Sequence, residues 1–239
     1  MVERLLKFPV VLLLALFLQL VPDRSHATFV DFESGSLNTG SGGGIFTSGG
    51  GWQGGAFQFA WDIDFDAATG QYRYIYTISN PLAANGALAR NVGHLLLQVS
   101  TTFTSGDLLG GTTPLAGPAT FTAQADSAPG SNPGLPTDLY GLKYDVTSVT
   151  LLTLRAPVDG SFYAKDGECN PTHPCSPGFS KVFAYNTGLT DPAGAFIRVP
   201  DTQTSTPPLT PVPEPTTLLL LGIGLIAAGA AARRFVDKD

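Results

Sequence analysis

Residues 57–66 read Phe57-Gln58-Phe59-Ala60-Trp61-Asp62-Ile63-Asp64-Phe65-Asp66. Large apolar side chains alternate with polar or small ones along this stretch, which is the pattern of a β-strand with one buried face. The next four residues end in Gly70, which can adopt the positive φ that a tight turn needs. Residues 71–79 alternate again and place Tyr72, Tyr74, Tyr76 and Ile78 on one side. The sequence therefore predicts an antiparallel hairpin with an aromatic face.

Short apolar stretches separated by turn residues continue on both sides of this hairpin. They predict further strands at Phe29–Phe32, Leu95–Phe103, Thr120–Ala123, Leu139–Val146, Val149–Leu154, Ser161–Lys165, Lys181–Tyr185 and Phe196–Val199. Residues 40–55 are rich in glycine and predict a loop, and residues 83–97 could hold a short helix. With 28 glycines and 19 prolines in 239 residues, long helices are disfavoured. We therefore expect residues 28–199 to form a mostly β domain, an antiparallel β-sandwich of jelly-roll-like type.

The first 27 residues have the organisation of a secretory signal peptide. Arg4 and Lys7 form a positive start, and an apolar run follows over residues 8–21. Small residues then stand at both key positions of a cleavage site, which predicts cutting between Ala27 and Thr28. The alternatives are an uncleaved anchor or a buried helix, but the apolar run is short for a membrane span. The expected partners of this segment are the general secretory translocon and signal peptidase.

The C-terminal end predicts a membrane anchor. Residues 200–215 are rich in proline, threonine and serine, cannot pack a core, and should be extended. Residues 216–232 contain no charged side chain and, as a helix, would span roughly 25 Å, close to the thickness of a bilayer's hydrocarbon core. Arg233 and Arg234 open the final segment, residues 233–239, and positive charge marks the cytoplasmic side. The folded domain is thus expected outside the inner membrane.

The order of features at this end resembles the PEP-CTERM sorting signal of Gram-negative bacteria. Val212-Pro213-Glu214-Pro215 precedes the apolar span, and Arg233-Arg234 closes it. The resemblance covers about the last 28 residues, and the chain departs from it in the five residues after the arginine pair. It implies recognition by an exosortase, transient anchoring in the inner membrane, and delivery to the cell surface or extracellular matrix of a host that makes exopolysaccharide. Proline on both sides of Glu214 should stop the helix from extending outward and hold this carboxylate on extended chain.

Two cysteines lie close together in the chain. Cys169 and Cys175 predict a disulfide in an oxidising compartment outside the membrane. The alternatives are free thiols, or a metal site that also uses His173, although no fourth ligand is apparent. The formal net charge is −6 and the basic residues gather at the two ends, so the interior is acidic. This charge distribution excludes nucleic acid as an expected partner.

Few side chains of the central domain suggest chemistry. Asp62, Asp64 and Asp66 alternate along one strand and could contribute to a calcium site, although the pattern does not continue as an EF-hand. The alternative is a solvated polar face. Trp52, in the glycine-rich loop, is the best candidate for an exposed ring that stacks on a sugar. His94 is expected to be a structural residue of its strand.

The sequence therefore predicts a non-enzymatic surface or matrix protein with a structural or adhesive domain and no cofactor. One alternative is a module that binds exopolysaccharide, aided by calcium. Another is a hydrolase of matrix polymers that uses two carboxylates, because paired carboxylates suffice for glycoside hydrolysis.

Overall fold

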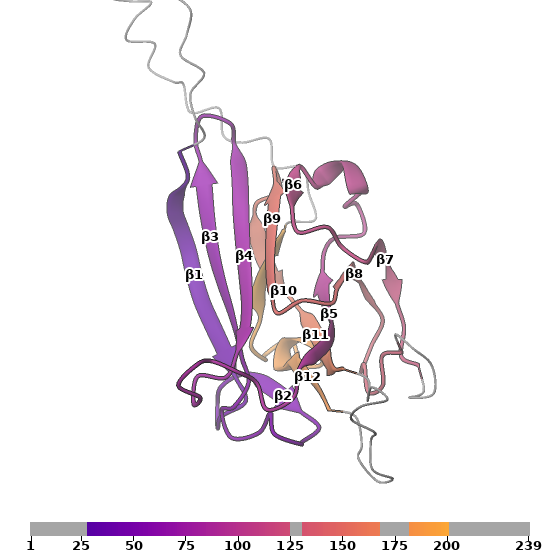
Figure 1. The fold of residues 1–239 in the computed structure, drawn as a ribbon. Coiled ribbons are helices and arrows are strands. Elements are labelled where there is room, and N and C mark those ends of the chain that lie inside the picture. Colours follow the sequence, from indigo (N-terminus) through magenta and orange to yellow (C-terminus); the bar gives the residue numbers. More distant parts are fainter. Residues whose placement is uncertain (1–27, 125–130, 168–181, 201–239) are drawn as a thin grey trace, which may run out of the picture. The chain divides into compact units, whose positions relative to one another are not determined.

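The predicted hairpin forms the centre of a five-stranded antiparallel sheet. The structure is a computed structural model, and it describes residues 28–124, 131–167 and 182–200 (Figure 1). The sheet has the order β1-β3-β4-β9-β6, and all its neighbours are antiparallel. Its strands are β1 (Val30–Asn38), β3 (Gln58–Asp66), β4 (Gln71–Ser79), β9 (Ser148–Thr153) and β6 (Gly110–Gly111). Phe59 lies opposite Ile78, and Phe65 lies opposite Tyr72, so the apolar sides of both strands share one face as predicted.

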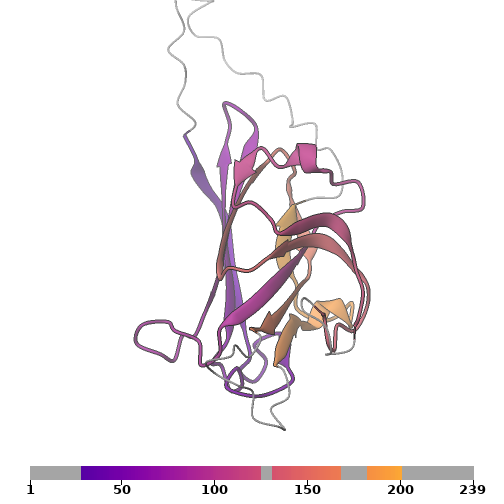
Figure 2. The same cartoon turned by 45° about the vertical axis from the view of Figure 1, so that its right-hand side comes forward.

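A second sheet of six strands faces the first. Its order is β2-β12-β11-β5-β8-β7. Its strands are β2 (Ile45–Thr47), β12 (Phe183–Asn186), β11 (Phe162–Asp166), β5 (Val92–Gln98), β8 (Leu139–Tyr144) and β7 (Ala116–Phe121). β10 (Pro157–Gly160) and β13 (Ile197–Pro200) form a separate pair. The two views in Figures 1 and 2 show the long strands β1, β3 and β4 in one layer and β5, β8 and β11 in the other.

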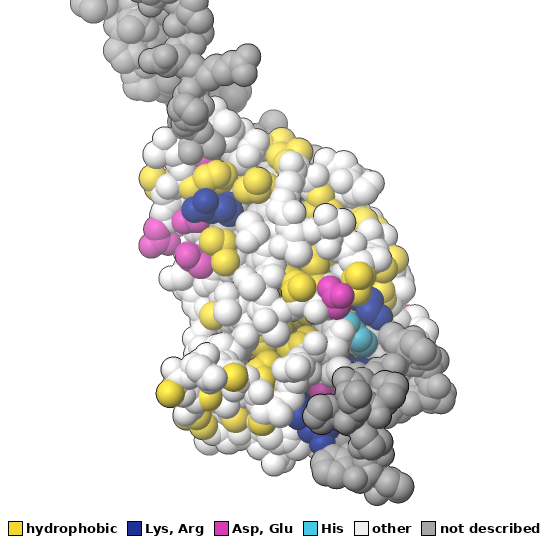
Figure 3. Space-filling view, in the orientation of Figure 1, with side chains coloured by type: hydrophobic (Ala, Val, Ile, Leu, Met, Phe, Trp, Pro, Cys, Tyr) yellow, Lys and Arg dark blue, Asp and Glu magenta, His cyan; other side chains and the backbone are white. Residues whose placement is uncertain are grey.

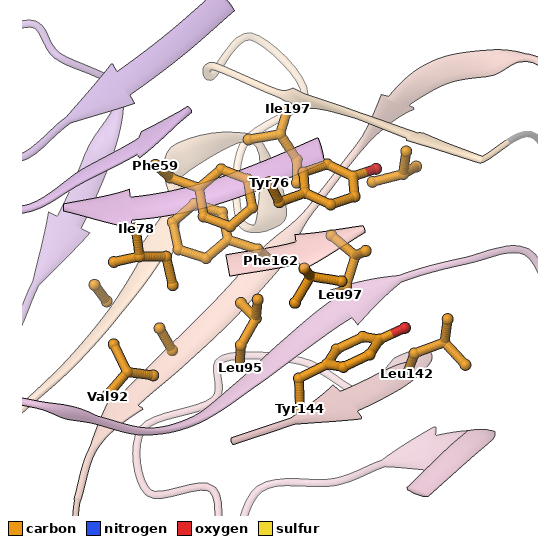
Figure 4. Close-up of a cluster of buried hydrophobic side chains, with 14 of the residues drawn as sticks. Phe59, Tyr76, Ile78, Val92, Leu95, Leu97, Leu142, Tyr144, Phe162 and Ile197 are labelled. Carbon is orange, nitrogen blue, oxygen red and sulfur yellow. The ribbon is translucent and has the colours of Figure 1, made fainter. Parts of the chain in front are cut away.

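The core lies between these two layers. The ring of Phe59 on β3 stacks on Phe162 of β11, with 4.3 Å between the ring centroids. Tyr76 on β4 and Leu97 on β5 are also buried in this cluster (Figure 4). Burial of aromatic and aliphatic side chains from both sheets holds the layers together. The expectation of a mostly β, antiparallel domain is confirmed, whereas the closer comparison with a jelly roll stays a prediction.

The edges of both sheets are built in ways that limit pairing with other chains. β2 and β6 are only three and two residues long. β7 contains Pro118, which has no backbone N–H to donate, and its register slips between Ala116 and Ala119. β1 is long, but its register also slips between Asp31 and Glu33, where two carboxylates stand on the edge. Short strands, bulges, proline and edge charges all hinder edge-to-edge association.

The described residues contain no α-helix, only two short 3₁₀ turns at Ser105–Asp107 and Thr187–Leu189. The short helix considered for residues 83–97 is therefore wrong: residues 80–91 form turns, and β5 begins at Val92. Glycine interrupts this segment, and burial in the sheet decides the conformation of the apolar half. No helix in the described ranges is long and apolar enough to span a bilayer. The predicted signal peptide and C-terminal span lie outside those ranges.

Candidate functional site

The three aspartates considered for calcium have separate roles. Asp62 is exposed, whereas Oδ2 of Asp64 lies 2.6 Å from a guanidinium nitrogen of Arg73 on the neighbouring strand. Asp66 is buried and caps the hairpin turn by accepting hydrogen bonds from the backbone N–H of Ala68 and the hydroxyl of Thr69. Among the residues that the structure describes, no group of three His, Cys, Asp or Glu could hold a metal ion. The arrangement therefore gives no support to calcium binding at this strand.

Trp52 is not the exposed ring that the sequence suggested. Its side chain is 0% exposed, and it packs against Phe57 with 4.6 Å between ring centroids. The indole N–H donates a 3.0 Å hydrogen bond to the carbonyl oxygen of Arg90. Trp52 is the largest side chain in a stretch that is otherwise mostly glycine, so it is the group that can anchor this loop on the core. The prediction of Trp52 as a sugar-stacking residue is wrong for this reason.

His94 belongs to a buried polar cluster on the outer face of the six-stranded sheet. Its Nε2 lies 2.9 Å from Oδ1 of Asn132. On the neighbouring strand, Nζ of Lys165 donates to the carbonyl oxygen of Ser131 at 3.3 Å, and the hydroxyl of Tyr163 donates to that of Pro133 at 2.7 Å. All three side chains are almost fully buried. They hold residues 131–133 against the sheet, a contact that we call the loop clasp, and they satisfy the hydrogen bonds that buried polar groups require.

The loop clasp covers a second apolar cluster. It consists of Leu96, Leu135, Leu139 and Tyr163 and is separate from the main core. Gly134 has φ of +69°, and a Cβ there would lie 2.1 Å from Cζ of Phe183. Only glycine allows the chain to pass so close to this ring. The buried histidine and lysine therefore have a structural explanation, and the strand periodicity of the sequence could not reveal it because the partners lie about 35 residues away.

Exposed aromatic rings extend this outer face to the edge strand β2. Phe46 is 44% exposed and stacks on Tyr185, with ring centroids 4.9 Å apart and planes at 26°. Tyr185 is in turn nearly parallel to Phe183, at 10°. Phe46 and Tyr185 are paired across β2 and β12, so their stacking is a cross-strand contact that stabilises the sheet, whereas Phe183 and Tyr185 are neighbours on one face of β12.

A shallow groove lies beside the β10–β13 pair. Its volume is about 320 Å³. It is lined by Gln98, Val99, Ser100, Thr101, Asp138, Tyr140, Val158, Asp159 and Val199. Valine and tyrosine side chains thus lie beside carboxylate, amide and hydroxyl groups, a combination that suits a ligand with apolar faces and many hydroxyls. One of its carboxylates, Asp159, is also 2.7 Å from Arg198.

Buried charges elsewhere are paired. Oδ2 of Asp166 lies 2.6 Å from Arg90, and burial raises the pKa of this carboxyl although the guanidinium opposes the rise. Nε of Arg155 donates to Asp107 at 2.9 Å, and this hydrogen bond lowers the pKa of Asp107. None of these four residues lines the groove. The first pair fixes the loop before β5 to β11, and the second joins the segment after β9 to the 3₁₀ turn at Ser105–Asp107.

The described residues thus form an antiparallel β domain, and the segment that relates the chain to known proteins is its C-terminus. Residues 211–234 match the family model of the PEP-CTERM protein-sorting motif. The chain therefore carries a PEP-CTERM sorting signal, which marks it as an exported protein that an exosortase processes. A search of curated proteins and a search of solved structures each found no match to the chain.

The matched range contains the predicted sorting residues Val212, Pro213, Glu214 and Pro215 at its start and Arg233 and Arg234 at its end. It lies outside the described residues, as do Ala27 and the predicted disulfide cysteines Cys169 and Cys175. Thr28, on the other side of the predicted cleavage site, is the first described residue. Signal cleavage and the disulfide therefore stay predictions.

Proposed function

We propose that this protein is a non-enzymatic component of the cell surface or extracellular matrix, with a structural or adhesive β domain that exosortase releases from an inner-membrane anchor. The observation that carries the proposal is the match of residues 211–234 to the sorting motif, which ten residues separate from the last described strand, ending at Pro200. In the described residues, His94 is held in the loop clasp, Asp64 and Asp166 are held in ion pairs, and Asp66 caps a turn. These assignments support a role without catalysis.

The proposed sequence of events follows from the properties of the tail. Residues 216–232 stop in the membrane because they are uncharged and long enough to span it, and Arg233 and Arg234 stay on the cytoplasmic side. Glu214, between two prolines, is then presented on extended chain at the outer interface, where the membrane enzyme can bind it. Processing near this motif would transfer the domain to the surface or matrix.

Mass spectrometry of the protein from its native host tests this proposal. We expect the mature chain to begin at Thr28 and to end near Pro213–Thr216. Glu214→Ala should retain Asp239 and accumulate in the inner membrane, whereas Ser205→Ala, a control in the same linker, should be processed normally. If the wild-type chain from an exosortase-positive host keeps Asp239, the sorting proposal fails and the protein is a simple tail-anchored ectodomain.

A second candidate function, binding of exopolysaccharide, is favoured by the groove beside β10 and β13. Carboxylates and amides bind sugar hydroxyls, and the valine and tyrosine side chains that line the groove suit the C–H face of a pyranose. The carboxylates Asp138 and Asp159 would favour neutral or amino sugars over uronic acids because like charges repel. A glycan array of the full chain, with and without chelator, tests this function. Asp138→Ala should abolish any signal, whereas Asp62→Ala, on another exposed surface, should preserve it.

A further inference from the structure

One end of the five-stranded sheet extends past the six-stranded sheet. The β3–β4 hairpin turns at this end (Figure 1). A single row of paired residues crosses four strands here: Val30, Phe65, Tyr72 and Thr153. The fifth strand continues the row, because the backbone N–H of Leu109 donates to the carbonyl oxygen of Leu152 at 2.8 Å. Five strands make an edge roughly 19 Å long, since neighbouring strands lie about 4.8 Å apart.

This end of the sheet exposes large apolar side chains. Val30 is 56% exposed, Phe32 51%, Leu109 47% and Leu154 45%. We call these four residues the apolar rim. They are half of the large hydrophobic residues that are exposed in the described parts of the chain. Figure 3 shows hydrophobic side chains beside charged groups at the upper end of the molecule, and further hydrophobic side chains in its middle and lower parts. An exposed apolar patch of this kind marks a contact surface more often than chance.

Phe32 is the centre of the rim and is held in place by its neighbours. It occupies the irregular position of β1 between Asp31 and Glu33. Its ring meets Tyr72 edge-on at 5.5 Å and lies 6.3 Å from Phe65, between centroids. The bulge thus turns an aromatic ring onto a sheet end where no opposite layer covers it. Half of the ring stays in contact with solvent.

The chain leaves the domain toward this same end. Pro200, the last described residue, pairs with Pro157. Arg155 lies two residues before Pro157, and its carbonyl oxygen accepts a 2.8 Å hydrogen bond from the hydroxyl of Tyr74. Tyr74 is the next inward-facing residue of β4 after Tyr72, which belongs to the row at the rim. β13 therefore runs toward the rim. Residues 201–215 can extend at most about 50 Å before the proposed membrane span begins. A tether of this length keeps the rim at a high effective concentration near the bilayer.

The charges next to the rim do not oppose contact with lipid headgroups strongly. Asp64 is paired with Arg73 at 2.6 Å, and Asp107 is paired with Arg155 at 2.9 Å. Glu33 is paired with Arg198 at 2.7 Å, which leaves the exposed Asp31 as the charge beside Val30. One carboxylate beside aromatic and aliphatic side chains suits the polar interface of a bilayer and disfavours deeper insertion, because charge is excluded from the hydrocarbon core.

We propose that the apolar rim rests in the interfacial layer of the membrane that anchors the tail, so that the domain stands on the bilayer with its hairpin end down. This proposal rests on the proposed function, because insertion of residues 216–232 brings the rim to the membrane. Aromatic and aliphatic side chains at headgroup level gain from leaving water while their backbone stays hydrated. The contact would also keep the Pro-Glu-Pro motif close to the interface until processing.

Fluorescence quenching in nanodiscs tests the proposal with the full chain. Phe32→Trp places an indole in the rim, and Leu82→Trp is the matched control because Leu82 is 69% exposed in the turns after β4, away from the rim. The native Trp52 and Trp61 contribute equally to both variants. In discs of phosphatidylcholine brominated near the headgroup, Phe32→Trp should lose most of its added fluorescence, and Leu82→Trp should keep it. Val30→Trp replaces the first variant if that one fails to fold.

The outcomes separate this proposal from the one on which it rests. If the chain stays in the disc after a carbonate wash, the membrane anchor is intact. If both tryptophan variants are then quenched equally, the proposal that the rim contacts the membrane is overturned. Failure of the chain to stay with the disc overturns both. If the fluorescence of Phe32→Trp changes only in discs that hold two chains, the rim contacts a second copy of the chain and the membrane proposal is overturned.

Discussion

The backbone N–H of Phe162 donates a 2.9 Å hydrogen bond to Oδ1 of Asn186, a side chain that is 0% exposed. The amide nitrogen of Asn186 donates in turn to the hydroxyl of Ser161 and to the carbonyl oxygens of Gly160 and Ala195. One buried amide therefore connects the start of β11, the end of β12 and the segment before β13. Buried polar networks of this kind stabilise only when every group is satisfied.

Replacing this amide should destabilise the domain. Asn186→Ala leaves the N–H of Phe162 without its acceptor and removes a donor from the carbonyl oxygens of Gly160 and Ala195, which should cost about 2–3 kcal/mol of unfolding free energy. Urea unfolding followed by tryptophan fluorescence measures the loss. Asn85→Ala, at an exposed turn, should change the free energy by less than about 0.5 kcal/mol. Equal effects of the two substitutions would show that the network does not stabilise the fold.

Trp52 should matter for stability and not for ligand binding. Trp52→Ala removes a fully buried indole and should cost about 3–5 kcal/mol. Trp52→Phe keeps part of the packing on Phe57 but loses the hydrogen bond to Arg90, so its cost should be smaller. Thermal unfolding gives the order of the three proteins. A normal melting temperature for Trp52→Ala would contradict burial of this ring.

The loop clasp should open locally when its shortest hydrogen bond is removed. Tyr163→Phe keeps the buried ring but removes the donor to Pro133, which should cost about 1 kcal/mol. Hydrogen–deuterium exchange should become faster in peptides that contain residues 131–139 while peptides from β3 and β4 stay protected. Tyr140→Phe removes a longer bond of 3.3 Å to Phe103 elsewhere in the domain, so it is the matched control. Faster exchange throughout the domain would mean that the clasp is part of the global core.

Two ion pairs should respond to acid in opposite ways. The hydrogen bond from Arg155 lowers the pKa of Asp107 below its ordinary value of 3.8, so the folded chain binds this proton less readily than the unfolded chain. Asp107 therefore stabilises the fold above that value, and the contribution is lost as the pH falls through the lowered pKa. Burial raises the pKa of Asp166 above 3.8, so its charge costs stability above the raised pKa, and acidification relieves this cost.

Comparison of two variants measures these contributions. Asp107→Asn should be less stable than wild type at neutral pH, and the deficit should shrink as the pH falls from about 5 to 3. Asp166→Asn should instead fall further behind wild type over the same range, because only the wild-type carboxyl gains by protonation. Urea unfolding at several pH values gives both differences. If both differences change in the same direction with pH, one of the assigned shifts has the wrong sign.

The sequence predicted the hairpin of β3 and β4 to within a residue, because strict alternation over two neighbouring stretches leaves one register that buries both aromatic faces. It missed β2 inside the glycine-rich stretch and β10 after Arg155, which are three and four residues long. Strands this short carry no period that can be read locally. They form because β12 and β13 offer partners, and those partners are distant in the chain.

The sequence alone determined that this protein carries a sorting signal for export and that its domain is mostly β. Sorting signals act as linear segments, so the proline-flanked Glu214, the uncharged run and the arginine pair are complete without a fold. Only the tertiary structure decided the surroundings of individual side chains. In the structure, Trp52 is buried in the core and Phe32 is exposed. Asp64 forms an ion pair, and Asp66 caps a turn. Periodicity assigns a residue to a face of its strand, but packing of the second layer decides which part of that face is covered.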